Sequence, residues 1–280
     1  MQPFIHDQLI ELALQEDIQT GDVTTLGTID AHMAGQARLM AKERLVFCGK
    51  QVFETVFRKI DPTVAVEWSG EDGQWVEPAA VIAIAKGPMR SILTGERTAL
   101  NFVRRLSGIA TFTRQFVDAV RDTGSQILDT RKTTPGWREL EKYAVRMGGG
   151  RNHRFSLSGG VMIKDNHIDA VGSLSAAVAR ARGFVPPSLK IEVEVRTLSE
   201  LQEALSAGAD MVLLDNMDLD TLREAVRIGK GKVLTEASGN VRLETIRAIA
   251  ETGVDFISVG AITHSARAVD LSLKVTRKTC

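Results

Sequence analysis

The sequence holds little of what marks secreted, nucleic-acid-binding or membrane-spanning proteins. Its 280 residues include two cysteines, Cys48 and Cys280, which are too few and too far apart for a disulfide framework or a zinc site. Lys and Arg total 35 and Asp and Glu total 35, so the net positive charge of a general nucleic-acid binder is missing. The longest apolar run, Ala79 to Ala85, is far shorter than the roughly 20 residues that span a bilayer.

The amino terminus, Met1 to Asp7, also lacks the basic region and apolar core of a secretory signal. Hydrophobic residues make up 44% of the chain and charged residues 25%, a balance that supports a substantial buried core. These features predict a soluble, reduced, cytoplasmic protein without a membrane or nucleic-acid partner.

The first part of the chain mixes helix and strand signals. In chain order they are an extended run (35–47), an amphipathic helix (50–60), a short strand around Val64 and Val66, the apolar run 79–85 and a helix (92–106). Arg97 falls on the polar face of the last helix. We expect an α+β open-faced sandwich domain over residues 1–107, joined by a C-terminal strand within 266–280, where apolar residues alternate.

Beyond residue 124, short apolar strands alternate with helices. Four of these strands end near residues 194, 215, 236 and 258, in steps of 21, 21 and 22 that are typical of β/α units. An open doubly wound sheet would usually carry a GxGxxG turn, which the sequence lacks. Since a complete barrel takes about 250 residues, residues 108–265 predict an incomplete TIM-like α/β barrel of six or seven strands.

Basic residues concentrate between Arg131 and Lys164, a segment that contains eight Lys or Arg and two acidic residues. A solvated helix face would account for three of them: Arg138, Lys142 and Arg146. It does not account for those that directly follow buried strands: Arg131, Lys132 and Lys164. His153 and Arg154 end a loop that begins with three glycines. Arginine matches carboxylates with two parallel hydrogen bonds, so the segment predicts a polyanionic ligand.

Acidic residues form a complementary set. Glu192 and Glu194 alternate along a strand and therefore share one face. An antiparallel strand could turn that face to solvent, whereas a barrel strand covered by helices turns it inward. Asp215 follows one β/α unit later. Hard carboxylate oxygens without a His/Cys cluster suit Mg²⁺, so Glu194 and Asp215 are the predicted metal ligands.

Two turns of small residues follow the last strands. They consist of Ser238, Gly239 and Asn240, and of Val259, Gly260 and Ala261. Asn240 is a plausible N-cap for a helix that starts near Val241. Helix N-termini bind anions, and the last loops of such barrels often hold a phosphate. We expect a phosphate site there.

Eight stretches spread over the chain form a recognisable pattern: Glu16–Ile18, Gly21–Thr24, Gly95–Asn101, Asp129–Gly136, Gly148–Arg154, Ile163–His167, Leu214–Met217 and Glu236–Asn240. Together they resemble the quinolinate phosphoribosyltransferases, the carboxylating nicotinate-nucleotide pyrophosphorylases of NAD biosynthesis. The resemblance covers essentially the whole chain. It implies Mg²⁺-dependent transfer of phosphoribose from phosphoribosyl pyrophosphate to quinolinate, with loss of CO₂ and pyrophosphate.

The resemblance also implies a role for each predicted site residue. The two quinolinate carboxylates would be held by Arg131, His153, Arg154 and Lys164, beside Thr130. Lys132 would face the pyrophosphate, Glu194 and Asp215 the ribose hydroxyls and the metal, and the two turns the 5′-phosphate. The implied catalytic set is Lys132, Lys164, Glu194 and Asp215. Arg97 would reach into the partner's site in a homodimer, or in a higher assembly of dimers.

Three alternatives stay open from the residues themselves. One is a Schiff-base aldolase on the same barrel, with Lys132 or Lys164 as the nucleophile. The others are a non-catalytic anion sensor and a paralogue that uses another acceptor base.

Overall fold

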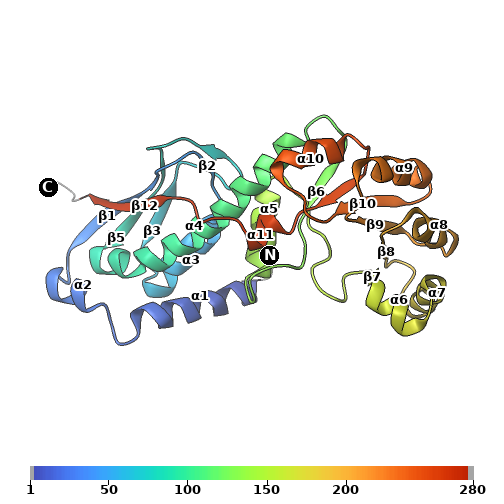
Figure 1. The fold of residues 1–280 in the computed structure, drawn as a ribbon. Coiled ribbons are helices and arrows are strands. Elements are labelled where there is room, and N and C mark those ends of the chain that lie inside the picture. The colour runs from blue at the N-terminus through green and yellow to red at the C-terminus, as the bar shows by residue number, and fades with distance from the viewer. Residues whose placement is uncertain (1–2, 277–280) are drawn as a thin grey trace. The chain divides into compact units, whose positions relative to one another are not determined.

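The computed structural model describes residues 3–276 and separates into two compact units (Figure 1). Among the described residues, unit 1 comprises those up to Arg114, Thr133–Gly149 and those from Thr263 onward, and unit 2 comprises Gln115–Lys132 and Gly150–Ile262. The predicted domain boundary at residues 107/108 stays a prediction. Cys280 and the last four residues of the predicted strand 266–280 lie outside the described residues.

Unit 1 is built on a four-stranded antiparallel sheet in the order β12-β1-β5-β3. Its strands are β1 (Ala34–Ala41), β3 (Ala65–Trp68), β5 (Val81–Pro88) and β12 (Leu271–Thr276). In the central register, Leu39 lies opposite Leu273 on one side and Ala83 on the other. The C-terminal strand β12 therefore pairs with β1 of the N-terminal part of the chain.

The helices of the N-terminal part include the predicted amphipathic one, α3 (Lys50–Ile60), which buries Phe53 and Phe57. The other elements are α1 (Pro3–Ile18), α2 (Val23–Thr28), α4 (Met89–Ala119), α5 (Arg138–Met147) and the pair β2 (Leu45–Val46) and β4 (Trp75–Val76). Helix α4 is much longer than the predicted 92–106. A Cβ on its Gly95 would lie 2.9 Å from the Phe57 ring, so glycine lets α4 approach α3 closely.

Unit 2 contains a six-stranded parallel sheet in the order β6-β11-β10-β9-β8-β7. Its strands are β6 (Gln126–Leu128), β7 (Val161–Ile163), β8 (Ile191–Val195), β9 (Met211–Asp215), β10 (Leu234–Ser238) and β11 (Phe256–Ser258). The connecting helices are α6 (Asp165–Val171), α7 (Leu174–Phe184), α8 (Leu198–Ser206), α9 (Leu219–Gly229) and α10 (Leu243–Ala250), and α11 (Ala261–His264) follows the last strand. The predicted incomplete barrel is confirmed, with β6 and β7 as its two edges.

The extended segment Gly150–Arg154 lies between these two edges. The Arg151 N–H donates to the Ile127 carbonyl at 2.8 Å, and the Asp129 N–H donates to the Arg151 carbonyl at 3.1 Å. The Arg154 guanidinium reaches the other side and donates to the Gly160 carbonyl at 2.8 Å, next to β7. The segment thus links the two edge strands of the barrel.

The start of α10 differs from the sequence prediction. The helix begins at Leu243 with Arg242 as N-cap, so the expected start near Val241 with an Asn240 cap is wrong. Gly239 (φ 101°) and Asn240 (φ 49°) both adopt left-handed conformations, which turn the chain before a helix can begin. The Asn240 side chain instead donates to Asn216 Oδ1 at 3.1 Å.

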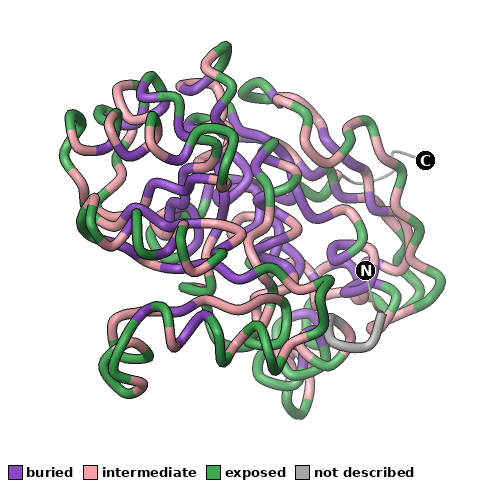
Figure 2. The backbone as a smooth tube through the Cα atoms, turned by 90° about the vertical axis from the view of Figure 1, so that its right-hand side faces the viewer, coloured by how far each residue is buried: buried purple, intermediate pink, exposed green. Residues whose placement is uncertain are grey.

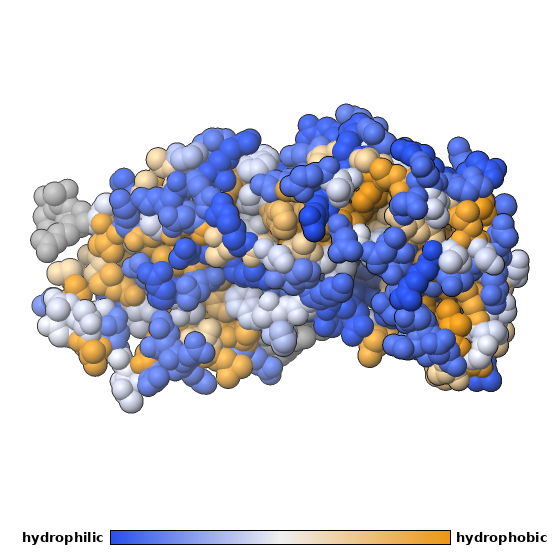
Figure 3. Space-filling model, viewed as in Figure 1, coloured by the Kyte–Doolittle hydropathy of each residue, from blue (hydrophilic) through white to orange (hydrophobic). Residues whose placement is uncertain are grey.

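The strands of unit 2 are mostly buried, and their residues Val193, Val212 and Ile257 have no exposed surface. Figure 2 draws buried residues in purple. Hydrophilic side chains cover much of the face seen in Figure 3, and hydrophobic ones are scattered between them. Within residues 3–276, no helix combines the length and apolar character needed to cross a bilayer.

Candidate active site

A pocket of about 360 Å³ opens at the carboxyl ends of the unit 2 strands. Nine of the predicted site residues line it: Thr130, Arg131, Lys132, His153, Arg154, Lys164, Glu194, Asp215 and Ser238. Seven of them meet because the carboxyl ends of parallel strands share one edge of the sheet, and His153 and Arg154 come from the segment Gly150–Arg154. The Lys132 N–H donates to Thr130 Oγ1 at 3.0 Å, which shapes the turn that presents both residues.

Six predicted residues are not part of this lining. Gly239 and Asn240 follow β10, and Val259, Gly260 and Ala261 follow β11, at the same edge of the sheet. Arg97 lies on α4 in unit 1 and is exposed. The roles implied for these six residues stay predictions.

The pocket also contains residues to which the sequence analysis gave no role. Glu236 and Ser258 line it together with Met162 and Leu213. Glu236 lies on β10 and is only 1% exposed. The sequence could have indicated Glu236, because an acidic residue in a parallel strand covered by helices points inward, as was expected for Glu194.

Two arginines of the pocket, Arg131 and Arg154, lie close enough for each charge to affect the other. Burial lowers the pKa of Arg154, and the positive charge of Arg131 lowers it further. Lys164 Nζ lies 3.1 Å from Glu194 Oε2. An anion bound between the two arginines would stabilise both charged forms. The arrangement therefore favours an anionic ligand.

The pairing of Lys164 also bears on the aldolase alternative. A Schiff-base lysine must be a neutral amine before it attacks a carbonyl. In the structure Lys164 Nζ forms an ion pair with Glu194. The aldolase alternative gains no support from this contact.

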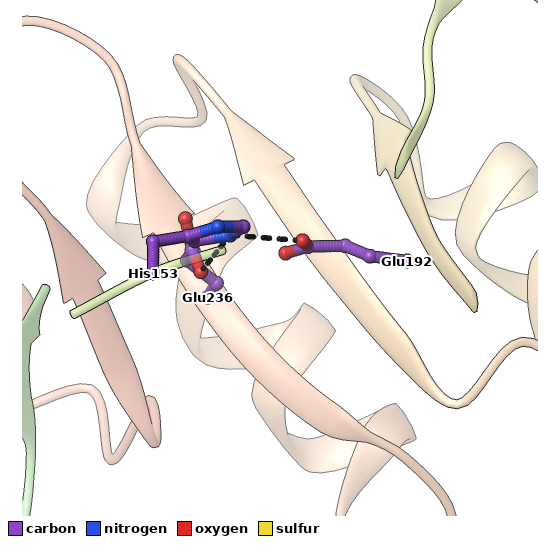
Figure 4. Close-up of side chains that lie close together, drawn as sticks. All are labelled: His153, Glu192 and Glu236. Carbon is purple, nitrogen blue, oxygen red and sulfur yellow. Dashed lines mark hydrogen bonds and ion pairs between the residues drawn. The ribbon is translucent and has the colours of Figure 1, made fainter. Parts of the chain in front are cut away.

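His153 lies between two buried glutamates (Figure 4). Its Nε2 is 3.0 Å from Glu192 Oε2 on β8 and 3.5 Å from Glu236 Oε2 on β10. Burial opposes a charge on the ring and is the largest single influence, but the hydrogen bonds and charges of the two glutamates together outweigh it and raise the pKa of His153 to about 9. Burial also raises the pKa of Glu192, and the contact with His153 opposes that rise.

The other ring nitrogen of His153 faces the backbone. The Arg154 N–H lies 2.7 Å from Nδ1 and donates to it, which favours a neutral ring and works against the two glutamates. Below the ring, buried Asp129 accepts from the His153 N–H at 2.8 Å and from the Asn152 side chain at 2.6 Å. These bonds fix the loop that carries Arg154.

The ligand atoms of His153, Glu192 and Glu236 lie within 4.8 Å of one another, a spacing that a metal ion could use. Glu192 Oε1 and Glu236 Oε1 have no hydrogen-bond partner among the described residues. However, donation to Nδ1 leaves the neutral ring's proton on Nε2, pointing at the glutamates. Neither a protonated ring nor this neutral tautomer offers Nε2 to a metal, so the contacts favour a histidine–carboxylate cluster.

We expect Glu236→Gln to lower the pKa of His153 toward its ordinary value of 6.5, because the variant removes one of the two stabilising carboxylates. In the wild type the folded-state pKa lies above the unfolded value, so the pairing stabilises the fold fully below pH 6.5 and that stabilisation is lost as the pH rises through about 9. NMR titration of the His153 ring measures the pKa directly. Exposed His264 serves as the internal reference, and an unchanged His153 curve would contradict the role of Glu236.

A second acidic cluster contains the predicted metal ligands. The Glu194 and Asp215 side chains are 12% and 20% exposed, and both face the pocket. Arg196 lies near both, and Asn216 donates to Asp215 Oδ1 at 3.0 Å. Two partly exposed carboxylates with room for water and a phosphate form a donor set that fits Mg²⁺.

The family models for the Quinolinate phosphoribosyl transferase N-terminal and C-terminal domains match residues 22–107 and 109–274. The chain is 46% identical over 276 residues to the probable carboxylating nicotinate-nucleotide pyrophosphorylase of Synechocystis, which covers 98% of this chain and 93% of that protein. The corresponding Bacillus subtilis protein is 45% identical over 261 residues, 93% of this chain and 90% of its own.

A solved structure gives the same result. The nicotinate-nucleotide pyrophosphorylase from Francisella tularensis superposes with a TM-score of 0.94 at 44% identity, covering 97% of this chain and 96% of that chain. The two domain models together span nearly the whole chain, and both sequence relatives are similar along most of their length. On this evidence, and in agreement with the pocket's residues, the chain belongs to the quinolinate phosphoribosyltransferase family.

Proposed function

We propose that the protein transfers phosphoribose from phosphoribosyl pyrophosphate to the ring nitrogen of quinolinate and removes the 2-carboxylate. The products are nicotinate mononucleotide, pyrophosphate and CO₂, a step of de novo NAD biosynthesis in the cytoplasm. The observation that carries this proposal is one pocket that combines two neighbouring arginines, Arg131 and Arg154, with two carboxylates, Glu194 and Asp215. Family membership supplies the reaction that such a pocket suits.

In this proposal the basic residues orient quinolinate. Arg131, Arg154 and Lys164 pair with its two carboxylates, beside Thr130, and planar guanidinium groups suit this contact. The resemblance gives His153 the same role, and its ring lies next to Arg154. Lys132 faces the departing pyrophosphate, and Ser238, Gly239 and Asn240 with Val259, Gly260 and Ala261 hold the 5′-phosphate.

Glu194 and Asp215 would hold Mg²⁺ and the ribose hydroxyls. The metal would supply positive charge to the pyrophosphate as it leaves. In this proposal the two carboxylates would also stabilise the positive charge that develops on the ribose as its C–O bond breaks.

The loss of CO₂ requires little from the protein beyond orientation. Once the ring nitrogen carries the ribose it is cationic, and it stabilises the electron pair left on the neighbouring carbon. Holding both carboxylates in a fixed geometry is then the main contribution of Arg131 and Arg154.

A substrate-selection assay tests this function. We expect purified protein to release pyrophosphate and CO₂ from quinolinate only when phosphoribosyl pyrophosphate and Mg²⁺ are present. Nicotinate, which lacks the 2-carboxylate, should be a poor acceptor because it would form fewer charge-assisted contacts with the basic residues of the pocket. Efficient steady-state turnover of nicotinate would refute the proposal.

We further propose a homodimer in which Arg97 of each subunit serves the partner's site, or a higher assembly of such dimers. Alone, Arg97→Ala and Lys164→Ala should each be nearly inactive. In a mixed dimer one site carries both intact residues. Random exchange makes about half of the dimers mixed, so activity should recover to roughly a quarter of wild type. If mass spectrometry shows mixed dimers but activity does not recover, Arg97 does not act across subunits.

A further inference from the structure

Arg196 has no role in the proposed reaction, yet it lies among the residues that would hold the metal. It directly follows β8 and is 55% exposed. Its Nη2 donates to Asp165 Oδ2 at 2.9 Å. Nη2 also lies 3.7 Å from Glu194 Oε1, and Nε lies 3.6 Å from Asp215 Oδ2. One guanidinium thus contacts three carboxylates.

The three contacts differ in kind. The contact with Asp165 is a charge-assisted hydrogen bond, whereas those with Glu194 and Asp215 are longer ion pairs. A hydrogen bond from the Asn166 N–H, and then the contact with Arg196, lower the pKa of Asp165, so this carboxyl stays ionised. Arg196 therefore forms one hydrogen-bonded ion pair, with Asp165, and two longer ion pairs. The longer ion pairs are with the predicted metal ligands, Glu194 and Asp215.

Without a metal, Glu194 and Asp215 would repel each other across the pocket rim. Lys164 offsets the charge of Glu194, and Arg196 offsets charge on both. A divalent cation between the two carboxylates would meet the Arg196 charge within a few ångströms. At such distances the two cations would repel each other.

We propose that Arg196 is a resident counter-ion that competes with the divalent cation for Glu194 and Asp215, while Asp165 holds the guanidinium when the cation binds. This inference rests on the metal site of the proposed function. Its consequence is that the metal alone binds weakly. Phosphoribosyl pyrophosphate brings negative charge that offsets both cations, so metal and substrate bind most favourably together.

The test measures Mn²⁺ affinity by electron paramagnetic resonance of the free ion, without any substrate. We expect Arg196→Gln to bind Mn²⁺ about three- to tenfold more tightly than wild type, because a competing charge is gone. The matched control is Arg223→Gln, which removes one exposed arginine paired with Asp220 on α9 and should leave the affinity unchanged. Unchanged or weaker binding by Arg196→Gln, or no binding by either protein, overturns the proposal.

Two further variants identify the cause. Asp165→Asn should weaken Mn²⁺ binding in the wild-type background, because Arg196 then pairs only with Glu194 and Asp215. In the Arg196→Gln background the same change should have little effect, and an equal loss there would overturn the role of Asp165. Asp215→Ala tests the metal site itself. If it leaves Mn²⁺ binding intact the proposed site is wrong, whereas if it abolishes binding and Arg196→Gln has no effect, only the counter-ion role is wrong.

Discussion

Quinolinate binding should fall by about 2–5 kcal/mol when Arg154 is replaced by alanine, as is typical when one partner of a buried charged pair is removed. Arg154 lies in the pocket, and its pKa is lowered by burial and by Arg131, so a bound carboxylate gains more from it than from a solvated arginine. Binding of phosphoribosyl pyrophosphate should change far less. Isothermal titration calorimetry with each substrate separates the two effects.

The same segment offers a matched control for this experiment. Arg151 is exposed, lies three residues earlier and is not part of the pocket lining. Arg151→Ala should therefore bind quinolinate like wild type, while Arg154→Lys, which keeps the charge but loses the planar fork, should fall in between. Quinolinate affinity at the wild-type level in Arg154→Ala would show that the carboxylates bind elsewhere.

Asp215→Ala should reduce turnover by about 100-fold or more, because removing one group aimed at transition-state charge typically costs 10²–10³ in rate. Quinolinate affinity should stay near wild type, since Asp215 contacts Arg196 and Asn216 and no cation assigned to quinolinate. Stopped assays of pyrophosphate release, combined with quinolinate calorimetry, distinguish this pattern from general damage. Asp220→Ala, at an exposed position of α9, is the control and should retain full turnover.

An equal loss of quinolinate affinity and turnover in Asp215→Ala would contradict the separation of the two anion sites. Full activity would remove Asp215 from the metal and ribose site altogether. Circular dichroism of both aspartate variants shows whether the barrel is intact. Asp215 ends β9 and is partly exposed, so its removal creates no core cavity.

Regular patterning allowed much of the fold to be predicted. Helix α3 has the bounds that its apolar spacing indicates, and the steps of about 21 residues correspond to successive parallel strands. The shared edge of the parallel strands then brought seven of the predicted pocket residues together, and His153 and Arg154 join them from the segment Gly150–Arg154. The spacing of apolar residues indicates individual helices and strands. The pairing of those strands in a parallel sheet then places their carboxyl ends side by side.

Features that depend on tertiary contacts could not be predicted in this way. Lys142, expected on a solvated face, is 1% exposed, and the neighbouring Glu141 is fully buried and pairs with Arg105 at 2.9 Å. The spacing of residues along a helix carries no information about an ion-pair partner 36 residues away in the sequence, such as Arg105 for Glu141. The contacts of Arg196 could not be predicted for the same reason, because they join side chains from three β/α units.

The segment Gly150–Arg154 has a consequence for local unfolding. Its backbone bonds to the β6 region, its His153 ring pairs with β8 and β10, and its Arg154 lines the pocket. Opening of this segment would break the barrel's edge contacts and the anion site in one cooperative event. A ligand that binds only the closed form must then slow amide exchange at Arg151 and Asp129, although neither amide touches the ligand. Substrate binding and the local opening of the barrel edge are therefore linked through the same equilibrium.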